Sequence, residues 1–227
     1  MRNAIQVGEL FVTIDNSGCI GENPQDEVQV PHEVTGYFTA RTAILEQWCA
    51  GAMPVQLVVA NFSGDDAWQP YINGFQQVFD EINIPTPPVT GSSETNFQAL
   101  QSAVSLTMLG KKAFANNTTN CRYFVVGEPL VGEEVVNNPQ KIASLGELYT
   151  GLNEGFIQAI WPVGSKGIGT EIERFTGSDK YEVDLPLKKS AGPSCAVLVA
   201  VNEQNISRFF QIMSAPITEI KLEILAE

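Results

Sequence analysis

Residues 195–201 read CAVLVAV, an apolar run without a polar interruption. A short run rich in β-branched residues predicts a strand, and a strand with no polar position needs cover on both of its faces. Elsewhere in the chain, strand-like segments alternate with segments whose apolar residues recur at helical spacing. We therefore expect helices layered on sheets, in an α/β (or α+β) fold.

The expected elements follow from these periodicities and from the turn residues between them. Strands are expected at 4–14, ending at Asp15, and at 28–30, 55–62, 100–110, 123–126, 156–163, 195–201 and 217–225, with a helix as the competing interpretation of 100–110. Helices are expected over 35–52, 65–83 and 139–150, shortly after Gly169, and over 203–213. Asp65 or Asp66 is a natural N-cap for the second helix.

The stretch 111–120, KKAFANNTTN, is polar and rich in turn residues. It is the best candidate for a domain boundary, although a long hairpin would also explain it. We expect an N-terminal domain over 1–118, with a mixed sheet and helices, and a compact α/β domain over 119–227 with glycine-rich loops.

The charge balance limits the partners. With 13 basic and 26 acidic residues, the net charge of −13 opposes binding to nucleic acid and to anionic membranes. The same negative field suits a protein that holds divalent cations. No apolar run reaches the roughly 20 residues that cross a bilayer, and Glu9 interrupts the first apolar stretch, so no signal peptide is expected and the chain is assigned to the cytoplasm.

Several catalytic classes lack their usual residues. Four separated cysteines and one histidine, His32, cannot supply a typical zinc site, so reduced and mostly buried thiols are expected. The sequence contains neither a P-loop nor a Gly-x-Ser-x-Gly nucleophile elbow. His32 lies in VPHEV, at an apparent strand end, where a structural role is the better interpretation.

Three carboxylates stand out by position. Asp15 ends the first expected strand and opens a glycine-rich loop, Glu46 lies on the 35–52 helix but off its apolar stripe, and Glu94 lies in the exposed segment VTGSSETNF, residues 89–97. Magnesium prefers carboxylate oxygens and often uses one or two of them together with substrate phosphates. These acids could share metal ions if the fold brings them together, and each one singly could be a solvated surface acid.

Three segments in order, TID, VPHEVTGYFTARTAILEQWCAGAMP and VTGSSET, resemble the aminoimidazole ribonucleotide synthetase (PurM-like) superfamily. The resemblance implies a PurM-like N-terminal domain and magnesium ions that bridge ATP phosphates, with Asp15, Glu46 and Glu94 as their ligands. Glu46 stands where the family has aspartate, and Ser92 and Ser93 replace a double glycine. The side chains of these serines narrow a loop that has no side chains at these two positions in family members.

A closer resemblance is to the alpha-ribazole kinase branch, through DNSGCIG, GAMP, NFSGDDAW and TGSSETN, and then PVGSKGIGTE (162–171) and KKSAGPS (188–194). It implies ATP-dependent phosphorylation of the 5'-hydroxyl of alpha-ribazole, a nucleoside used in cobalamin salvage. It also implies a homodimer, because family members pair their N-terminal sheets into an eight-stranded barrel.

The glycine-rich loops support phosphate chemistry through backbone amides and lysines ahead of a helix, although a helix start and a tight turn would also explain them. Asp65 and Lys166 are assigned to catalysis, Asp65 as acceptor contact or base. The residues assigned to ATP are Asn16, Ser17, Thr95, Asn96, Gly164, Ser165, Gly167, Lys189 and Ser190. Two alternatives remain: an ATP-dependent synthetase of the same superfamily, and a dimer that binds nucleotide without turnover.

Overall fold

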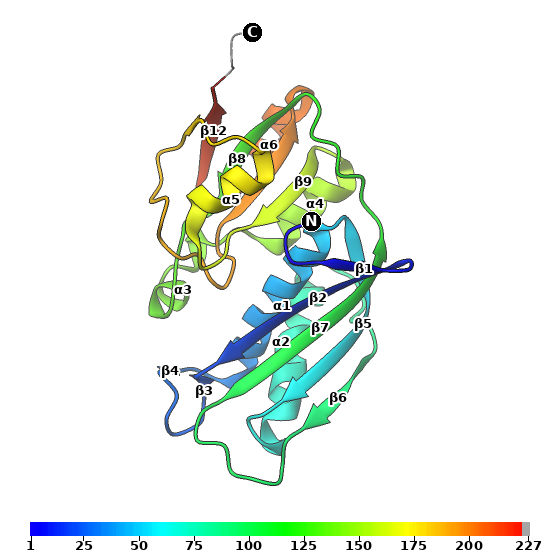
Figure 1. Ribbon diagram of the computed structural model, residues 1–227, viewed down its shortest axis with the longest axis vertical. Coiled ribbons are helices and arrows are strands. Elements are labelled where there is room, and N and C mark those ends of the chain that lie inside the picture. Colours follow the sequence, from blue (N-terminus) through cyan, green and yellow to red (C-terminus); the bar gives the residue numbers. More distant parts are fainter. Residues whose placement is uncertain (224–227) are drawn as a thin grey trace. The chain divides into compact units, whose positions relative to one another are not determined.

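The computed structural model describes residues 1–223, which form two compact units (Figure 1). The first unit contains Met1 and Asn3–Ala113, and the second contains Arg2 and the chain from Phe114 onward. The expected boundary after residue 118 lies in the segment that joins the last strand of the first unit to the first strand of the second. Within residues 1–223, no helix combines the length and apolarity needed to cross a membrane.

The first unit is built on a five-stranded mixed sheet with strand order β1-β2-β7-β5-β6. Its strands are β1 (Ile5–Val7), β2 (Leu10–Gly18), β5 (Ala52–Asn61), β6 (Val89–Ser93) and β7 (Ala103–Lys112). Neighbouring strands are antiparallel, except that β6 runs parallel to β5. A separate parallel pair joins β3 (Ile20–Gly21) to β4 (Val28–Gln29).

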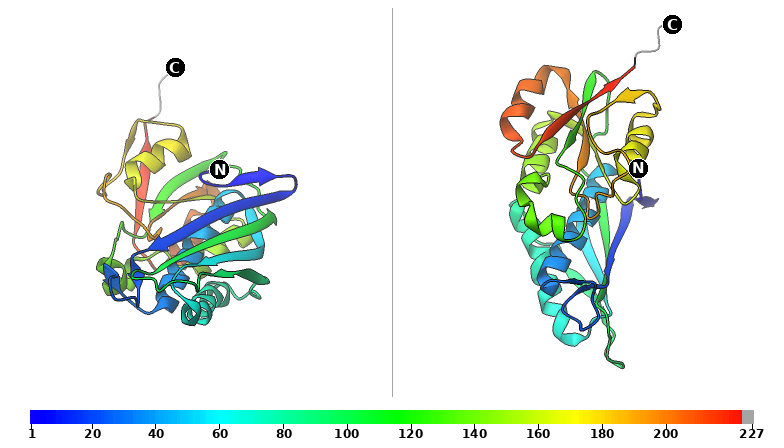
Figure 2. Two further views of the ribbon diagram at one scale, coloured as in Figure 1. Left: turned by 60° about the horizontal axis from the view of Figure 1, so that its bottom comes forward. Right: turned by 90° about the vertical axis from the view of Figure 1, so that its left-hand side faces the viewer.

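Two helices cover one face of this sheet, α1 (His32–Cys49) and α2 (Trp68–Glu81), the second preceded by the 3-10 turn η1 (Asp65–Ala67) (Figure 2). Strict alternation buries Val104, Leu106 and Met108 of β7 against them. The two helices approach closely at Gly74, where a Cβ would collide with the carbonyl oxygen of Glu33 on α1. Glycine is therefore required at this contact.

The opposite face of the sheet, here called the outer face, carries exposed apolar side chains. Ile5, Val7 and Ile14 are 62%, 58% and 55% exposed, and Val58 of β5 also faces solvent. Contiguous exposed apolar surface is uncommon on monomeric proteins, so this face has the composition of a contact surface.

The second unit contains a five-stranded antiparallel sheet of order β10-β12-β8-β11-β9. Its strands are β8 (Cys121–Val126), β9 (Ile157–Pro162), β10 (Tyr181–Glu182), β11 (Val197–Asn202) and β12 (Ile217–Leu222). Its helical segments are α3 (Glu133–Asn137), η2 (Pro139–Lys141), α4 (Leu145–Glu154), α5 (Gly167–Thr176), η3 (Glu203–Asn205) and α6 (Ile206–Ile212).

The apolar run that predicts a fully covered strand is β11, and this prediction is confirmed. Leu198 packs with Ile168 and Ile172 of α5 on one face of the sheet. On the other face, Phe124 of the neighbouring strand β8 stacks on Phe209 of α6, with ring centroids 5.1 Å apart. Helices therefore cover both sides of the central strands. The mixed α/β fold class expected from the sequence is confirmed.

Several predicted elements were displaced or divided. The strand expected at 4–14 is a hairpin: Val7 pairs with Leu10 across a two-residue turn in which Gly8 has a φ of +60°. Because β2 continues to Gly18, Asp15 lies inside a strand and does not end one. His32 begins α1 and is not at a strand end.

Helix boundaries differ for local reasons. The helix expected at 139–150 begins later, as α4, because the Ser144 side chain caps it by accepting a hydrogen bond from the amide of Glu147. Neither Asp65 nor Asp66 caps α2 through its side chain; both lie in the 3-10 turn before it. The segment expected as an exposed turn at 89–97 begins with the strand β6. The last two residues of the strand expected at 217–225 lie outside the described part of the chain.

Candidate functional site

Asp15 lies on the helix-facing side of β2. Its neighbours in the alternation, Thr13 and Ser17, both contact α1: the Thr13 hydroxyl donates to the carbonyl oxygen of Ala43 at 3.2 Å, and the Ser17 hydroxyl lies 2.8 Å from that of Thr39. Since successive side chains of a strand point to opposite faces, Asp15 points toward α1 and Asn16 toward the outer face. Asp15 and Asn16 therefore lie on opposite faces of the sheet.

The hydroxyl of Ser17 is engaged inside the unit. Thr39 donates its own hydroxyl proton to the carbonyl oxygen of Thr35 at 2.8 Å, so the contact between the Ser17 and Thr39 hydroxyls uses the proton of Ser17. The Ser17 hydroxyl consequently links β2 to α1. It contributes to packing inside the unit and is already hydrogen-bonded.

Glu94 is exposed immediately after β6, and its carboxylate is oriented locally. Its Oε1 accepts hydrogen bonds from the backbone amide of Asn96 at 2.7 Å and from the side-chain amide of Asn96 at 2.9 Å. Asn96 therefore orients the carboxylate through its backbone amide and one side-chain N–H. Thr95, between them, is exposed.

The end of β5 connects the Glu94 segment to the turn that carries Asp65. The side-chain nitrogen of Asn61 donates to the carbonyl oxygen of Gly64 at 2.7 Å and to the hydroxyl of Ser93 at 3.0 Å. Asp65 follows Gly64 and is exposed. Two residues predicted for the site, Asp65 and Glu94, are thus borne by segments that meet at one end of the sheet.

A buried tyrosine lies beneath this end of the sheet. The hydroxyl groups of Tyr71 and Ser63 are 2.7 Å apart, and the Ser63 hydroxyl also accepts the backbone amide of Ala103 at 2.9 Å. Burial raises the pKa of Tyr71, and the hydrogen bond with Ser63 partly opposes that rise. A neutral tyrosine therefore helps to anchor the segment after Asn61 to the start of β7.

Glu46 lies elsewhere. It is 1% exposed and its Oε1 accepts a hydrogen bond from the side-chain amide of Asn3 at 3.1 Å. Glu46 is expected off the apolar stripe of its helix, and it is buried all the same, because α1 is buried along most of its surface. The next residue, Gln47, bonds to the backbone of Phe11, near the start of β2, so Glu46 lies at the end of the sheet opposite Asn61.

The three predicted magnesium ligands do not gather within one chain. Asp15 is aligned across the sheet with Leu106, Val59 and Gly91, and Glu94 lies three residues beyond Gly91. Strand spacing and rise then separate Asp15 from Glu94 by about 17 Å, whereas carboxylate oxygens that share one magnesium ion lie within about 4 Å of each other. Within residues 1–223, no three His, Cys, Asp or Glu side chains are grouped for a metal ion.

A magnesium ion held mainly by nucleotide phosphates requires only one or two protein carboxylates. Glu94 fits that requirement, since it is exposed and among the described residues only its Oε1 is engaged. Asp15 is half-buried and belongs to a different part of the sheet. The residues of this unit therefore fit a metal brought by a nucleotide, and they do not form a site closed by three carboxylates.

The second unit brings its two glycine-rich loops together. The amide of Ala191 donates to the carbonyl oxygen of Gly164 at 3.3 Å, and the amide of Gly169 donates to that of Leu187 at 3.0 Å. At Gly167, where φ is +81°, a Cβ would collide with the Leu187 carbonyl oxygen. Segments 164–167 and 187–191 thus form one surface, here called the double loop.

The amides available in the double loop are fewer than the sequence suggests. Gly167 donates its amide to the carbonyl oxygen of Gly164 at 3.2 Å, so the amides of both Gly167 and Gly169 are used within the protein. Ser165 and Lys166 are exposed at the start of α5. Ser190 is half-buried, and its hydroxyl accepts the amide of Gly192 at 3.3 Å.

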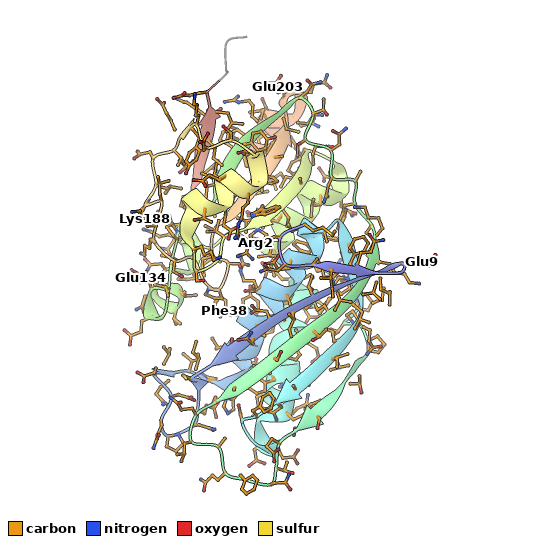
Figure 3. The ribbon with its side chains drawn as sticks, in the orientation of Figure 1. Arg2, Glu9, Phe38, Glu134, Lys188 and Glu203 are labelled. Atoms are coloured by element: carbon orange, nitrogen blue, oxygen red, sulfur yellow. The ribbon has the colours of Figure 1, made fainter. Side chains whose placement is uncertain are left out.

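Lys189 is paired. Its ammonium group contacts both carboxylate oxygens of Glu134 on α3, at 2.9 and 2.8 Å. Figure 3 labels Glu134 and Lys188, the residue that precedes Lys189. The hydrogen bond from Lys189 lowers the pKa of Glu134. An anion that binds Lys189 would compete with Glu134 for the ammonium group.

The four cysteines differ in their exposure. Cys49 and Cys195 are buried and Cys19 and Cys121 are partly exposed, so the expectation of mostly buried thiols holds for two of the four.

His32 is 6% exposed and the centroid of its ring lies 5.1 Å from that of the Tyr71 ring. These contacts agree with a structural histidine.

The sequence analysis assigns no role to Asn61, although its position in the strand pattern marks it as unusual. Leu57 and Val59 define the buried phase of β5, and Asn61 continues this phase as a polar residue. A carboxamide in the buried register of a strand requires hydrogen-bond partners. That requirement is the signal that would have identified it.

No family model matches the sequence, and no curated protein matches it. Solved structures match over nearly the whole chain at low identity. Thiamine monophosphate kinase from Aquifex aeolicus aligns with a TM-score of 0.63 and 10% identity, over 98% of this chain and 87% of the kinase. The hydrogenase maturation protein HypE aligns with a TM-score of 0.60 and 12% identity, over 96% of this chain and 82% of HypE.

PurL from T. maritima, solved with AMPPCP, aligns with a TM-score of 0.54 and 14% identity, over 97% of this chain and 42% of PurL. Identities this low establish a shared architecture and leave the chemistry open. The chain has the mixed α/β, PurM-like fold of these proteins.

Proposed function

We propose that this protein is an ATP- and magnesium-dependent kinase of a small molecule. The observation that carries the proposal is the convergence of segments 164–167 and 187–191, which were assigned to phosphate from their sequence, into one double loop. The fold supports it, because one structure of thiamine monophosphate kinase contains AMPPCP and TMP. That structure aligns over 96% of this chain at 11% identity.

We further propose the 5'-hydroxyl of alpha-ribazole as the acceptor, on the basis of the segments DNSGCIG, GAMP, NFSGDDAW and TGSSETN. The acceptor oxygen forms a bond to the γ-phosphorus of ATP, and the bond from that phosphorus to the bridging oxygen breaks, which releases ADP. The hydroxyl proton passes to a base. Asp65, exposed on the turn held by Asn61, is our candidate for that base.

Phosphoryl transfer depends mainly on positioning and on neutralising charge. In the first unit, Glu94 would hold the magnesium ion, with Asp15 as a candidate for a second one; the ion, when bound, neutralises phosphate charge. In the second unit, Lys166 and Lys189 supply positive charge, and the hydroxyls of Ser165 and Ser190 are candidates to bind phosphate. Glu46, which is 1% exposed, is not retained in the set.

We also propose that the chain acts as a homodimer in the cytoplasm. The outer face supports this, since Ile5, Val7 and Ile14 leave apolar side chains exposed that a second copy would cover. The absence of disulfides among the described cysteines agrees with a reducing compartment. Light scattering on the purified protein tests the dimer.

The direct test is to incubate the protein with magnesium-ATP and alpha-ribazole and to measure ADP and ribazole phosphate. Asp65→Asn should abolish transfer, while the control Asp66→Asn, at the adjacent exposed acid, should leave it intact. Product that persists in Asp65→Asn and in Glu94→Gln would contradict the site assignment. Nucleotide binding without transfer would favour the non-catalytic alternative, and formation of a different product would favour a synthetase.

A further inference from the structure

Asn61 uses its whole carboxamide inside the first unit. The residue is 1% exposed and ends β5. Its nitrogen donates to the carbonyl oxygen of Gly64 and to the hydroxyl of Ser93, and its Oδ1 accepts the backbone amide of Ser63 at 2.9 Å. Both amide hydrogens and the oxygen are therefore engaged, which fixes the orientation of the group.

The same residue also holds Glu94 through its main chain. The carbonyl oxygen of Asn61 accepts the backbone amide of Glu94 at 2.8 Å. One residue thus bonds to Glu94 directly and to its neighbour Ser93 through the side chain. Asn96 then sets the carboxylate by two hydrogen bonds to Oε1. The backbone and the carboxylate of Glu94 are positioned by different residues.

We propose that Asn61 is a positioning residue for Glu94, because it holds the backbone of this residue where the carboxylate can reach a magnesium-nucleotide. The inference rests on the proposed function, in which Glu94 binds the metal. Loss of the Asn61 carboxamide removes its hydrogen bonds to Gly64, Ser63 and Ser93, so only main-chain pairing then holds the end of β6 against β5. Groups that orient a metal ligand change metal affinity by about 10-fold to 100-fold when they are removed.

The arrangement also gives Ser93 a role. Ser93 is half-buried and accepts its hydrogen bond from Asn61, whereas its neighbour Ser92 is exposed. The Ser93 hydroxyl therefore belongs to the support of Glu94. Replacing this serine by glycine removes the hydroxyl and should weaken metal binding in this chain.

The test measures binding and needs no turnover. Binding of AMPPCP is followed by calorimetry while the Mg²⁺ concentration is varied, and the half-saturating Mg²⁺ concentration is compared between variants. Asn61→Ala should raise that concentration about 10-fold or more. Gln47→Ala is the matched control, because Gln47 is a carboxamide with 0% exposure whose nitrogen bonds to Phe11, Thr13 and Met108 at the other end of the sheet.

Both variants should lower the unfolding temperature, and only Asn61→Ala should shift the Mg²⁺ dependence. Equal shifts in both, or a shift in neither, would overturn the positioning role. If the wild-type protein binds AMPPCP with no dependence on Mg²⁺, or does not bind it, the proposed function itself fails.

A second pair of variants keeps the test decisive if Asn61→Ala does not fold. Ser93→Ala removes one hydrogen bond of Asn61 and should raise the half-saturating Mg²⁺ concentration, although less than Asn61→Ala. Ser92→Ala, one position away and exposed, should leave it unchanged. Identical Mg²⁺ dependence in Ser93→Ala and in the wild type would contradict the inference.

Discussion

The carboxylate of Asp26 accepts two hydrogen bonds from Ser102, one from its backbone amide and one from its hydroxyl, both at 2.6 Å. Asp26 also accepts the amide of Asn23 at 2.9 Å, and the amide of Gln25 donates to the carbonyl oxygen of Leu100 at 3.0 Å. The loop after β3 is thereby fastened to the segment that leads from Glu94 into β7. That segment is held by Asn61 at its start and by Asp26 at its end.

Asp26→Ala should destabilise the protein by about 2 kcal/mol, because hydrogen bonds to a charged group contribute about 1.5–3 kcal/mol. Ser102→Ala should cost less, since it keeps the bond from the backbone amide. Urea denaturation gives both values. Asp66→Ala serves as the control at an exposed carboxylate, and an equal loss of stability in Asp66→Ala would contradict the role of Asp26.

The ion pair of Lys189 with Glu134 should weaken nucleotide binding. If phosphate competes for the Lys189 ammonium group, Glu134→Gln should increase the affinity for AMPPCP, and Lys189→Ala should decrease it. Solvent screens an exposed ion pair, so the increase should be small, no more than about 5-fold. Equilibrium binding at low salt measures it, with Glu133→Gln, on the same short helix, as control. An unchanged affinity in Lys189→Ala would exclude this residue from the phosphate site.

Glu171 is buried with 0% exposure and accepts hydrogen bonds from Arg2 at 3.0 Å and from the indole nitrogen of Trp161 at 2.8 Å. Arg2→Ala should destabilise the second unit by about 3 kcal/mol, because it leaves a buried carboxylate without its main counter-charge. The double variant with Glu171→Gln should lose less than Arg2→Ala alone, since the buried charge is then gone. A denaturant series on the single and double variants checks this order.

Arg174 offers the control for that series. It lies 3.6 Å from the same carboxylate, but its side chain is 44% exposed. Arg174→Ala should therefore cost about 1 kcal/mol or less. A loss equal to that of Arg2→Ala would show that burial does not distinguish the two arginines.

Burial raises the pKa of Tyr37 to about 12, and its hydrogen bond to Glu81 adds to the effect. The folded state thus favours the neutral phenol. Below about pH 10 the phenol is neutral in both states and its contribution is complete. Between about pH 10 and about pH 12 the unfolded phenol ionises first, so the free energy of unfolding should fall.

Tyr37→Phe cannot ionise and should lose less stability over that pH range than the wild-type protein. Urea denaturation at several alkaline pH values measures the difference. Tyr149→Phe, compared with the wild type at neutral pH, is the control for the loss of a tyrosine hydroxyl as such. Parallel pH curves for Tyr37→Phe and the wild type would contradict the assigned cause.

Periodic segments were predicted well and local boundaries were not. The run 195–201 required cover on both faces whatever its neighbours were, and β11 has that cover. The strand expected at 4–14 is divided by a turn at Gly8. This turn forms because the residues before it pair with the residues after it, and the apolar pattern of a single strand does not show that pairing. Helix α4 starts at Ser144 because a capping hydrogen bond decides its first turn, and that bond depends on local geometry.

The site shows a similar division. The sequence predicts that Glu94 is exposed and that segments 162–171 and 188–194 contain glycine-rich loops, and the structure agrees on these local features. The roles assigned to them stay predictions. Glu46 could not be judged, because its burial depends on how α1 packs against the sheet and on Asn3, which is 43 residues away. The separation of Asp15 from Glu94 depends on strand order, which no local pattern encodes.

The amino-acid order alone determined that this chain forms helices on sheets, carries strong negative charge, and places polar loops after apolar strands. These properties follow from periodicity and composition, which act over a few residues. Only the tertiary structure decided that Asn61 joins Glu94 to the Asp65 turn, and that Ser93 supports this link. Hydrogen bonds between residues 32 positions apart form only when strand pairing brings them together, so their partners cannot be known before the fold is.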